Sequence, residues 1–151
     1  MKRRGTRNRS RRRVVLIFGD PNAGKSHLAS QLREAYGYDV LSLDETYVEF
    51  VKERFPDLYL PALRDVIAQH FQTMLQGWDS GAASRAWREH VASVVEARSR
   101  QHFLLAVEGF LLLPALADVQ ARLASKATVT TVEARARQYF VASSIEEIHG
   151  R

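Results

Sequence analysis

An eight-residue stretch from Gly19 to Ser26 constrains this chain more than any other part of it. Its sequence, GDPNAGKS, fits the pattern G-x-x-x-x-G-K-[ST] at every fixed position, and the apolar run 14–18 (VVLIF) precedes it. Two glycines let the backbone curl so that successive N–H groups point inward at phosphate oxygens, and the positive end of a following helix adds to that field. The stretch therefore predicts a phosphate-binding loop between a strand and a helix.

Residue types within this loop indicate separate roles. Lys25 is placed to reach the β- and γ-phosphates of a nucleoside triphosphate such as ATP, and Ser26 offers its hydroxyl to Mg²⁺. For His27, directly after the loop, a surface or packing role on the helix is the favoured alternative. The residues expected around the nucleotide are Gly19, Asp20, Pro21, Asn22, Ala23, Gly24, Lys25, Ser26 and His27. A turn that binds nothing would leave the Lys25–Ser26 pair unexplained.

Length and composition indicate one ordinary globular domain. The chain has 151 residues, of which 46% are hydrophobic and 26% charged, enough for a single core. It contains no cysteine, which excludes a disulfide framework and a thiolate metal site and fits a reducing compartment. No apolar run approaches the roughly 18 residues that a membrane span needs. We expect a cytoplasmic protein without a membrane span.

The net positive charge of the chain comes from basic residues near its N-terminus. Eight of the 22 basic residues lie within the first 13 positions, which leaves 14 against 17 acidic residues and a net charge of about −3 for residues 14–151. We therefore divide the chain into a basic arm, residues 1–12, and a folded domain, residues 13–151. A solvated, disordered tail is the favoured interpretation of the arm. Weak, salt-sensitive contact with nucleic acid or anionic lipid is the alternative.

Apolar patterns predict that strands and helices alternate along the domain. Short runs rich in β-branched and apolar residues predict strands at 13–18, 39–43, 101–107 and 128–132. Apolar residues at helical spacing predict helices at 26–36, 45–55, 63–78, 83–98, 114–123 and 133–148, with a turn at 77–81 and Pro114 as the first residue of its helix. This order indicates an α/β fold with three layers, in which helices cover both faces of a short parallel sheet of about four or five strands.

Acidic residues stand where the later strands end. Asp44 and Glu45 follow the second strand, Glu108 the third and Glu133 the fourth. Ligands of parallel sheets bind beyond the carboxyl ends of the strands, and phosphoryl transfer needs a carboxylate to accept the proton of the acceptor hydroxyl. Asp44 is the candidate base, and Glu108 is a candidate to hold Mg²⁺ through water or to touch the acceptor. The alternative for either carboxylate is capping of the following helix.

Three stretches together resemble the P-loop small-molecule kinases, and most closely the branch of uridine kinase and nicotinamide riboside kinase. They are the loop 19–26, the segment 41–47 (LSLDETY) and the segment 107–112 (VEGFLL). In that branch the second strand ends in an Asp-Asp or Asp-Ser pair followed by an aromatic residue, and the third ends in Glu-Gly followed by apolar residues. The resemblance covers about residues 13–133.

This resemblance implies a P-loop NTPase fold and ATP- and Mg²⁺-dependent phosphotransfer. It implies that Asp44 is the base, that Tyr47 is the aromatic residue near the acceptor, and that Glu108 is a ligand for metal-bound water or substrate. Glu45 departs from the pattern, because the branch usually has a second Asp or a small residue there.

A second departure concerns the lid that these kinases usually carry after the fourth strand. That lid contains several arginines and is followed by a fifth strand, whereas only Arg135 and Arg137 stand near its place and the chain given ends at Arg151. Either arginine is a candidate to stabilise the transferred charge, with a plain surface role as the favoured alternative. A short lid would limit closure and the exclusion of water.

For several other residues the sequence supports a functional role less strongly. Arg64, Arg85 and Arg88 lie where related kinases bind the acceptor, although a solvated helix face is the favoured explanation. Trp78 and Trp87 stand on apolar stripes, which favours core packing over stacking on a base.

The sequence therefore predicts a kinase that transfers the γ-phosphate of ATP to a hydroxyl of a small metabolite, such as a nucleoside, a nucleotide or a cofactor precursor. Two alternatives stay open. In the first, the chain is a kinase whose acceptor is a polynucleotide 5′-hydroxyl or an antibiotic. In the second, it is a nucleotide-binding module without turnover.

Overall fold

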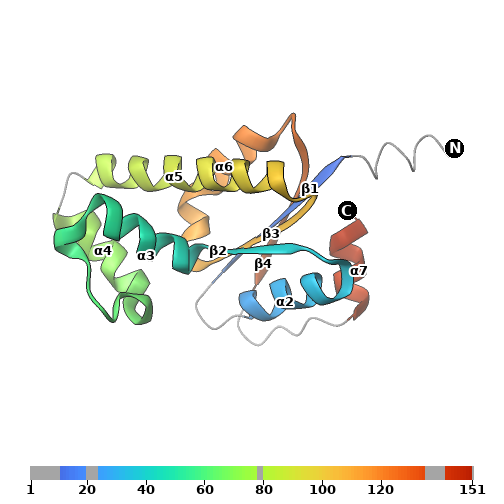
Figure 1. Cartoon of the computed structure of the whole chain (residues 1–151), viewed down its shortest axis with the longest axis horizontal. Helices are drawn as coiled ribbons and strands as arrows, with labels where there is room; N and C mark the ends of the chain where they lie inside the picture. The colour runs from blue at the N-terminus through green and yellow to red at the C-terminus, as the bar shows by residue number, and fades with distance from the viewer. Residues whose placement is uncertain (1–10, 20–23, 78–79, 135–141, 151) are drawn as a thin grey trace, which may run out of the picture.

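A parallel β-sheet forms the centre of the molecule (Figure 1). The computed structural model describes residues 11–19, 24–77, 80–134 and 142–150. Within these ranges the sheet has four strands in the order β2-β3-β1-β4, and every pair of neighbours is parallel. The strands are β1 Arg12–Gly19, β2 Asp39–Ser42, β3 Leu104–Glu108 and β4 Ala127–Ala134. The alternation of strands and helices in the sequence correctly predicted this α/β architecture.

Helical segments connect the strands and cover both faces of the sheet (Figure 1). The α-helices are α2 Lys25–Tyr36, α3 Leu43–Arg54, α4 Ile67–Gly77, α5 Ser80–Gln101, α6 Leu116–Leu123 and α7 Ala142–Gly150. The short 3₁₀ helices are η1 Pro56–Leu58, η2 Leu63–Val66 and η3 Phe110–Ala115. No helix in the described ranges is both long and apolar enough to cross a membrane.

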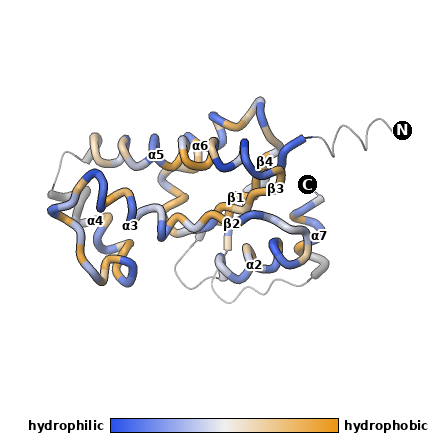
Figure 2. The backbone as a smooth tube through the Cα atoms, viewed as in Figure 1, coloured by the Kyte–Doolittle hydropathy of each residue, from blue (hydrophilic) through white to orange (hydrophobic). Residues whose placement is uncertain are grey.

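Side-chain alternation along β1 divides the core into two clusters. Val14 and Leu16 pack on one face with α3, α5, α6 and η3, while Val15 and Ile17 pack on the other with α2 and α7. This follows from the two-residue period of a strand, which sends neighbouring side chains to opposite faces. The two central strands, β1 and β3, are apolar along most of their length (Figure 2), as expected for strands whose two faces are both covered.

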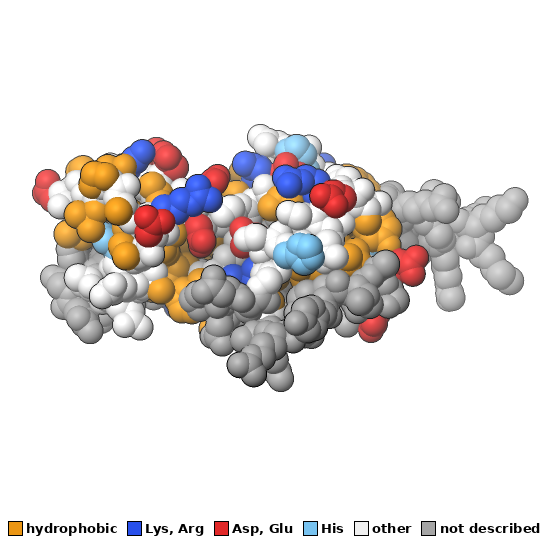
Figure 3. All heavy atoms as spheres, turned by 90° about the horizontal axis from the view of Figure 1, so that it is seen from below, with side chains coloured by type: hydrophobic (Ala, Val, Ile, Leu, Met, Phe, Trp, Pro, Cys, Tyr) orange, Lys and Arg blue, Asp and Glu red, His pale blue; other side chains and the backbone are white. Residues whose placement is uncertain are grey.

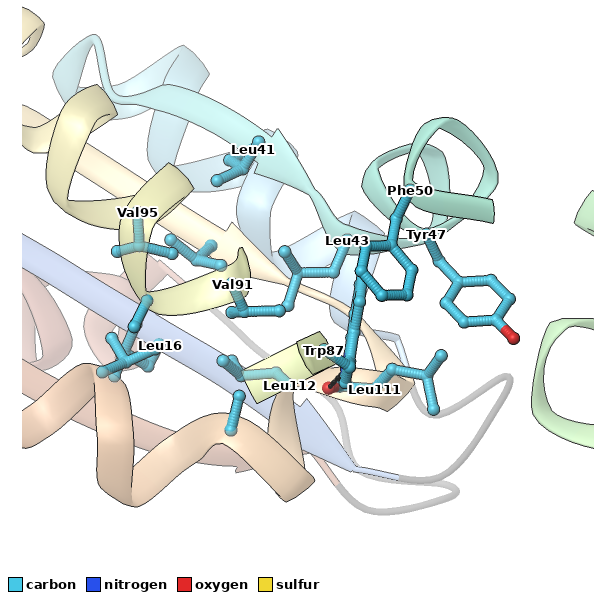
Figure 4. Close-up of a cluster of buried hydrophobic side chains, with 14 of the residues drawn as sticks. Leu16, Leu41, Leu43, Tyr47, Phe50, Trp87, Val91, Val95, Leu111 and Leu112 are labelled. Carbon is cyan, nitrogen blue, oxygen red and sulfur yellow. Dashed lines mark hydrogen bonds between the residues drawn. The ribbon is translucent and has the colours of Figure 1, made fainter. Parts of the chain in front are cut away.

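The larger cluster is rich in aromatic side chains, several of which lie around Trp87 (Figure 4). Trp87 is 0% exposed, and its ring lies 5.3 Å from the rings of both Tyr47 and Phe50. Its indole N–H donates to the carbonyl of Leu111 over 3.1 Å, so the buried polar atom is satisfied. Core packing is therefore confirmed for Trp87, and the hydrogen bond fastens η3 to α5. Trp78 lies outside the described residues.

Several element boundaries differ from the predicted ones. β2 ends at Ser42 and Leu43 already begins α3, while α5 continues to Gln101 so that β3 starts only at Leu104. Pro114 lies inside η3 and does not begin α6. Proline lacks an N–H and has a fixed φ, and a 3₁₀ turn preceding an α-helix accommodates it as readily as the first α-helical position does.

The predicted final helix is present as α7, but its predicted start at Glu133 was wrong. β4 continues through Glu133 to Ala134, because these residues stay in register with Phe18 and Gly19 of β1. Residues 135–141 lie outside the described part of the chain, and α7 begins at Ala142. The strand predicted from the β-branched run 128–132 thus continues for two further residues at its carboxyl end, because of a pairing with β1 that composition alone does not reveal.

Basic residues at the end of the predicted arm belong to the folded part. Arg12 is the first residue of β1, and Arg11 donates to the carbonyls of Ala124 and Ala127 over 3.4 and 3.3 Å. Arg13 donates to the carbonyl of His149 in α7. Arg12 donates to the carbonyl of Ser99 in α5. Arg11 and Arg12, which the sequence pattern assigned to the arm, therefore make contacts within the fold, as Arg13 does.

Gly19 provides a test of the close approach between β1 and β4. Its φ is +141°, and a Cβ built there would lie 2.0 Å from the carbonyl oxygen of Ala134. We expect Gly19→Ala to lower the free energy of unfolding by about 3 kcal/mol or more, since strain and overlap add. Gly37→Ala is the matched control: its φ of +77° is also positive, but nothing lies within 4 Å of a Cβ there, and we expect a cost of about 1 kcal/mol. Urea unfolding measures both, and equal costs would contradict the clash.

Candidate active site

The register of the strands brings one set of residues to the same level at the carboxyl end of the sheet. Glu108 of β3 pairs with Ile17 of β1 on one side and with Ser42 of β2 on the other. Ile17 packs in the cluster that faces α2, and paired positions in parallel strands share a face. Glu108 and Ser42 therefore point to the side of the sheet on which α2 begins.

The predicted phosphate loop connects β1 to α2 at this level. Asp20, Pro21, Asn22 and Ala23 lie outside the described residues, whereas both flanking glycines are described. Gly24 has a φ of +88°, which is left-handed, and stands as the residue before the first turn of α2. Lys25 is only 8% exposed, and its Nζ donates to the carbonyl of Gly19 over 3.0 Å. Its ammonium group therefore joins the two ends of the loop.

Glu108 is a buried carboxylate with hydroxyl partners, and 6% of the residue is exposed. The side chains of Ser42 and Ser26 hydrogen-bond to it, so β2 and α2 both hold it in place. Burial raises the pKa of Glu108, and the negative charge of Asp44 raises it further. The hydroxyl hydrogen bonds and the charge of Lys25 partly oppose this increase.

Asp44 lies in the first turn of α3, directly after β2. Burial raises the pKa of its carboxyl above the ordinary 3.8, while the charges of Lys25 and Arg64 lower it and that of Glu45 raises it. Two carboxyl groups with raised pKa values thus stand beside one buried ammonium group. Such perturbed titratable groups concentrate at functional sites.

These groups line one cavity of about 720 Å³, a volume within the usual range of ligand sites. Lys25, Ser26, Asp44 and Glu108 contribute from the strand ends and α2, and residues 64–69 of η2 and α4 contribute the remaining long stretch of wall. His27 and Phe110 complete the lining together with Gly24. Acidic and basic side chains lie close together in the middle of the face seen in Figure 3, beside the end formed by α3 and α4.

The wall formed by residues 64–69 is fastened to α3 through Tyr47. The Tyr47 hydroxyl donates to Nδ1 of His70 over 2.7 Å, and Nε2 of His70 donates to the carbonyl of Leu58 over 2.7 Å. This order follows because a carbonyl only accepts. Tyr47 is 0% exposed, packs against Trp87 and is not among the described lining residues of the cavity. The structure thus places in the core the side chain that the resemblance puts near the acceptor.

Arg64, for which the sequence favoured a solvated helix face, lies at the cavity. Its side chain is exposed and lies 3.4 Å from the carboxylate of Glu45, yet the residue lines the cavity. A solvated helix face explains its exposure but not its place beside Asp44. Arg88 is not among the described lining residues of the cavity, and its partly exposed side chain lies 3.9 Å from the carboxylate of Asp118.

The structure brings Gly24, Lys25, Ser26, His27, Asp44 and Glu108 of the predicted site together around one cavity. Arg135 and Arg137 lie outside the described residues. Glu133 lines a neighbouring cavity instead. Sequence reasoning missed Ser42, although its position at the end of the second strand was a usable signal, and it missed Phe110 and the segment 65–69, for which only the fold gives the signal.

The donor set at the cavity suits a hard cation. A hydroxyl from Ser26 and a carboxylate from Glu108 are oxygen ligands of the kind that Mg²⁺ prefers, and Mg²⁺ is usually held by one or two carboxylates together with substrate phosphates. Ser26 and Glu108 already interact with each other, so one ion would reach both. The residues therefore fit Mg²⁺ together with a triphosphate.

A scan against protein-family models and a search of curated proteins gave no match to this chain.

Proposed function

We propose that this protein transfers the γ-phosphoryl group of ATP to a hydroxyl group of a small organic acceptor. The observation that supports this most strongly is the shared cavity. The lysine and serine of the phosphate-loop pattern line it together with two carboxyl groups whose pKa values are raised. Nucleotide binding without turnover would need Lys25 and Ser26, whereas Asp44 would then serve only α3, whose first turn it occupies.

The chemistry divides among residues of the chain. The carboxylate of Asp44 accepts the proton of the acceptor hydroxyl, whose oxygen bonds to the γ-phosphorus. The bond from that phosphorus to the oxygen bridging to the β-phosphate breaks, and ADP leaves with the electron pair. The ammonium of Lys25 neutralises charge on the β- and γ-phosphate oxygens, and the raised pKa of Asp44 favours proton transfer.

Ser26 and Glu108 would hold Mg²⁺ beside the phosphates. When bound, the ion would neutralise phosphate charge and help to position the oxygens for in-line transfer. The burial of Glu108 and its hydroxyl partners orient its carboxylate before any ligand arrives, which is the preorganisation that charge stabilisation requires.

The decisive experiment measures ADP release from Mg-ATP with a mixed panel of acceptors. The panel contains nucleosides, nucleotides, vitamin ribosides, amino-sugar antibiotics, 5′-hydroxyl oligonucleotides and simple alcohols, with Lys25→Ala as the blank. Acceptor-dependent ADP release that the Lys25 variant lacks supports a kinase and indicates its acceptor class. ATP binding with no release above the blank for any acceptor supports the non-catalytic module and overturns the proposal.

Glu108→Gln tests the metal role. The amide keeps the shape of the side chain but loses the charge, so we expect the Mg²⁺ concentration for half-maximal turnover to rise about tenfold or more. Glu89→Gln, on the exposed face of α5, is the control and should leave that concentration unchanged. A titration with MgCl₂ at saturating ATP gives the result. An unchanged Mg²⁺ requirement in Glu108→Gln would remove this residue from the metal site.

A further inference from the structure

A second cavity of about 360 Å³ adjoins the first, and we call it the annex. The two cavities share Ala68 of α4 and Phe110 of η3 in their linings. Phe110 follows Glu108 by two residues, and Gly19 at the end of β1 also lines the annex. The annex therefore opens beside the groups to which we assign catalysis.

The lining of the annex is mostly apolar. Rings and aliphatic side chains come from β1, α4 and η3: Phe18, Phe71, Leu111, Leu113 and Pro114. Gln72 and Glu133 are the polar side chains among the described lining residues, and no lysine, arginine or histidine is among them. Such a surface favours an uncharged, apolar occupant, because apolar burial supplies the binding free energy.

The wall of the annex is built into the core. The buried Trp87 donates to the carbonyl of Leu111, and Leu111 and Leu112 are themselves buried in the main cluster (Figure 4). Phe71 of α4 is buried and packs near Trp87. The η3 and α4 walls are thus held before any ligand arrives, as is usual for small-molecule sites.

We propose that the annex binds an apolar body carried by the acceptor, so that the acceptor is an alcohol with a predominantly hydrocarbon or aromatic body and not a nucleotide or a polar sugar. This inference rests on the proposed phosphotransfer. The two shared residues, Ala68 and Phe110, lie on α4 and η3 and not on the phosphate loop. A molecule with its hydroxyl at Asp44 would therefore extend past them into the annex.

A homologous series of primary alcohols tests the proposal. ADP release from Mg-ATP is measured with 1-propanol through 1-octanol and, for comparison, with glycerol and ribose. Burial of each added methylene should raise kcat/KM by about fourfold until the annex is full. Glycerol and ribose should be the poorest acceptors. A flat series, or a preference for the polar acceptors, would overturn the inference while leaving phosphotransfer intact.

Two variants test whether the dependence of kcat/KM on chain length arises in the annex. Ala68→Phe places a ring at the junction of the two cavities and should remove the dependence on chain length. Ala97→Phe, at an exposed position of α5 that lines neither cavity, should preserve it. Thermal unfolding of each variant checks the fold. If Ala68→Phe raises KM for ATP and not for the alcohol, the annex holds the nucleotide base and the inference is wrong.

Binding of a neutral apolar dye separates this inference from the proposed function. N-phenyl-1-naphthylamine should become fluorescent with the wild-type protein and be displaced more effectively by 1-octanol than by 1-propanol. Ala68→Phe should weaken dye binding at least tenfold, and Ala97→Phe should not. If no acceptor yields ADP release that depends on Lys25, the phosphotransfer proposal fails, and with it the acceptor role. Equal dye binding by wild type and Ala68→Phe overturns the annex as an apolar site whatever the turnover.

Discussion

Replacement of Lys25 by methionine is expected to lower kcat/KM for ATP by at least about 10³-fold and to remove measurable triphosphate binding. Methionine keeps an apolar stem in the buried position but deletes the ammonium group that donates to Gly19. A preorganised donor aimed at developing charge typically contributes about 10²- to 10³-fold to the rate, and a full charge contributes more than a neutral donor. Steady-state ADP release measures this loss.

Thermal unfolding supplies a second readout of the same change. A ligand at about 100 times its Kd adds roughly 2.7 kcal/mol to stability, which in a domain of this size raises Tm by roughly 5 to 10 °C. We expect that increase with wild type plus Mg-ATP and none with Lys25→Met. Lys52→Ala, an exposed lysine on α3, serves as the control and should respond like wild type. An equal Tm increase in Lys25→Met would show that the phosphates bind elsewhere.

Asp44→Asn is expected to reduce kcat by about 10³-fold while the Tm increase with Mg-ATP stays within a degree or so of wild type. An amide has the size of the carboxylate but cannot accept the acceptor proton, and general-base catalysis typically contributes about 10²- to 10⁴-fold. Glu49→Gln, an exposed carboxylate on the same helix, should leave kcat unchanged. Turnover close to that of wild type in Asp44→Asn would exclude this residue as the base.

The pH dependence of turnover provides a further check on Asp44. The base works only when ionised, so kcat/KM should fall about tenfold per unit as pH drops below the pKa of Asp44. Burial raises that pKa above the ordinary 3.8, and the decline should therefore begin at a higher pH than it would for an exposed aspartate. The residual activity of Asp44→Asn should lose the contribution of Asp44 to this acid limb and keep only that of Glu108, whose pKa burial also raises.

The strands could be predicted from the sequence because their apolar and β-branched runs are continuous, as in a sheet covered on both faces. The residues at which the strands begin and end could not be predicted. β4 reaches Ala134 through pairing with Gly19, and α5 displaces the start of β3 by packing through Trp87, Val91 and Val95. Both effects depend on contacts between segments far apart in the chain, which local patterns do not contain.

The candidate site also contains residues that the sequence could predict and residues that it could not. Lys25, Ser26, Asp44 and Glu108 were predictable because parallel strands place their carboxyl ends at one edge. Arg64 and Tyr47 were not, since both stand on helical segments whose direction relative to the cavity depends on tertiary packing. Tyr47 turns into the core, where His70 satisfies its hydroxyl, whereas Arg64 remains at the cavity.

The pairing of Glu108 with Ile17 and Ser42 limits how the length of this protein can vary. One residue inserted in the middle of β3 would send Glu108 to the opposite face of the sheet, away from Ser26. Two inserted residues would restore the face but move the carboxylate by about 6.6 Å along the strand. An insertion at the exposed His102, in the connection before β3, would leave the pairing untouched. Homologous chains should therefore differ in length at such connections, while β1, β2 and β3 keep a constant number of residues.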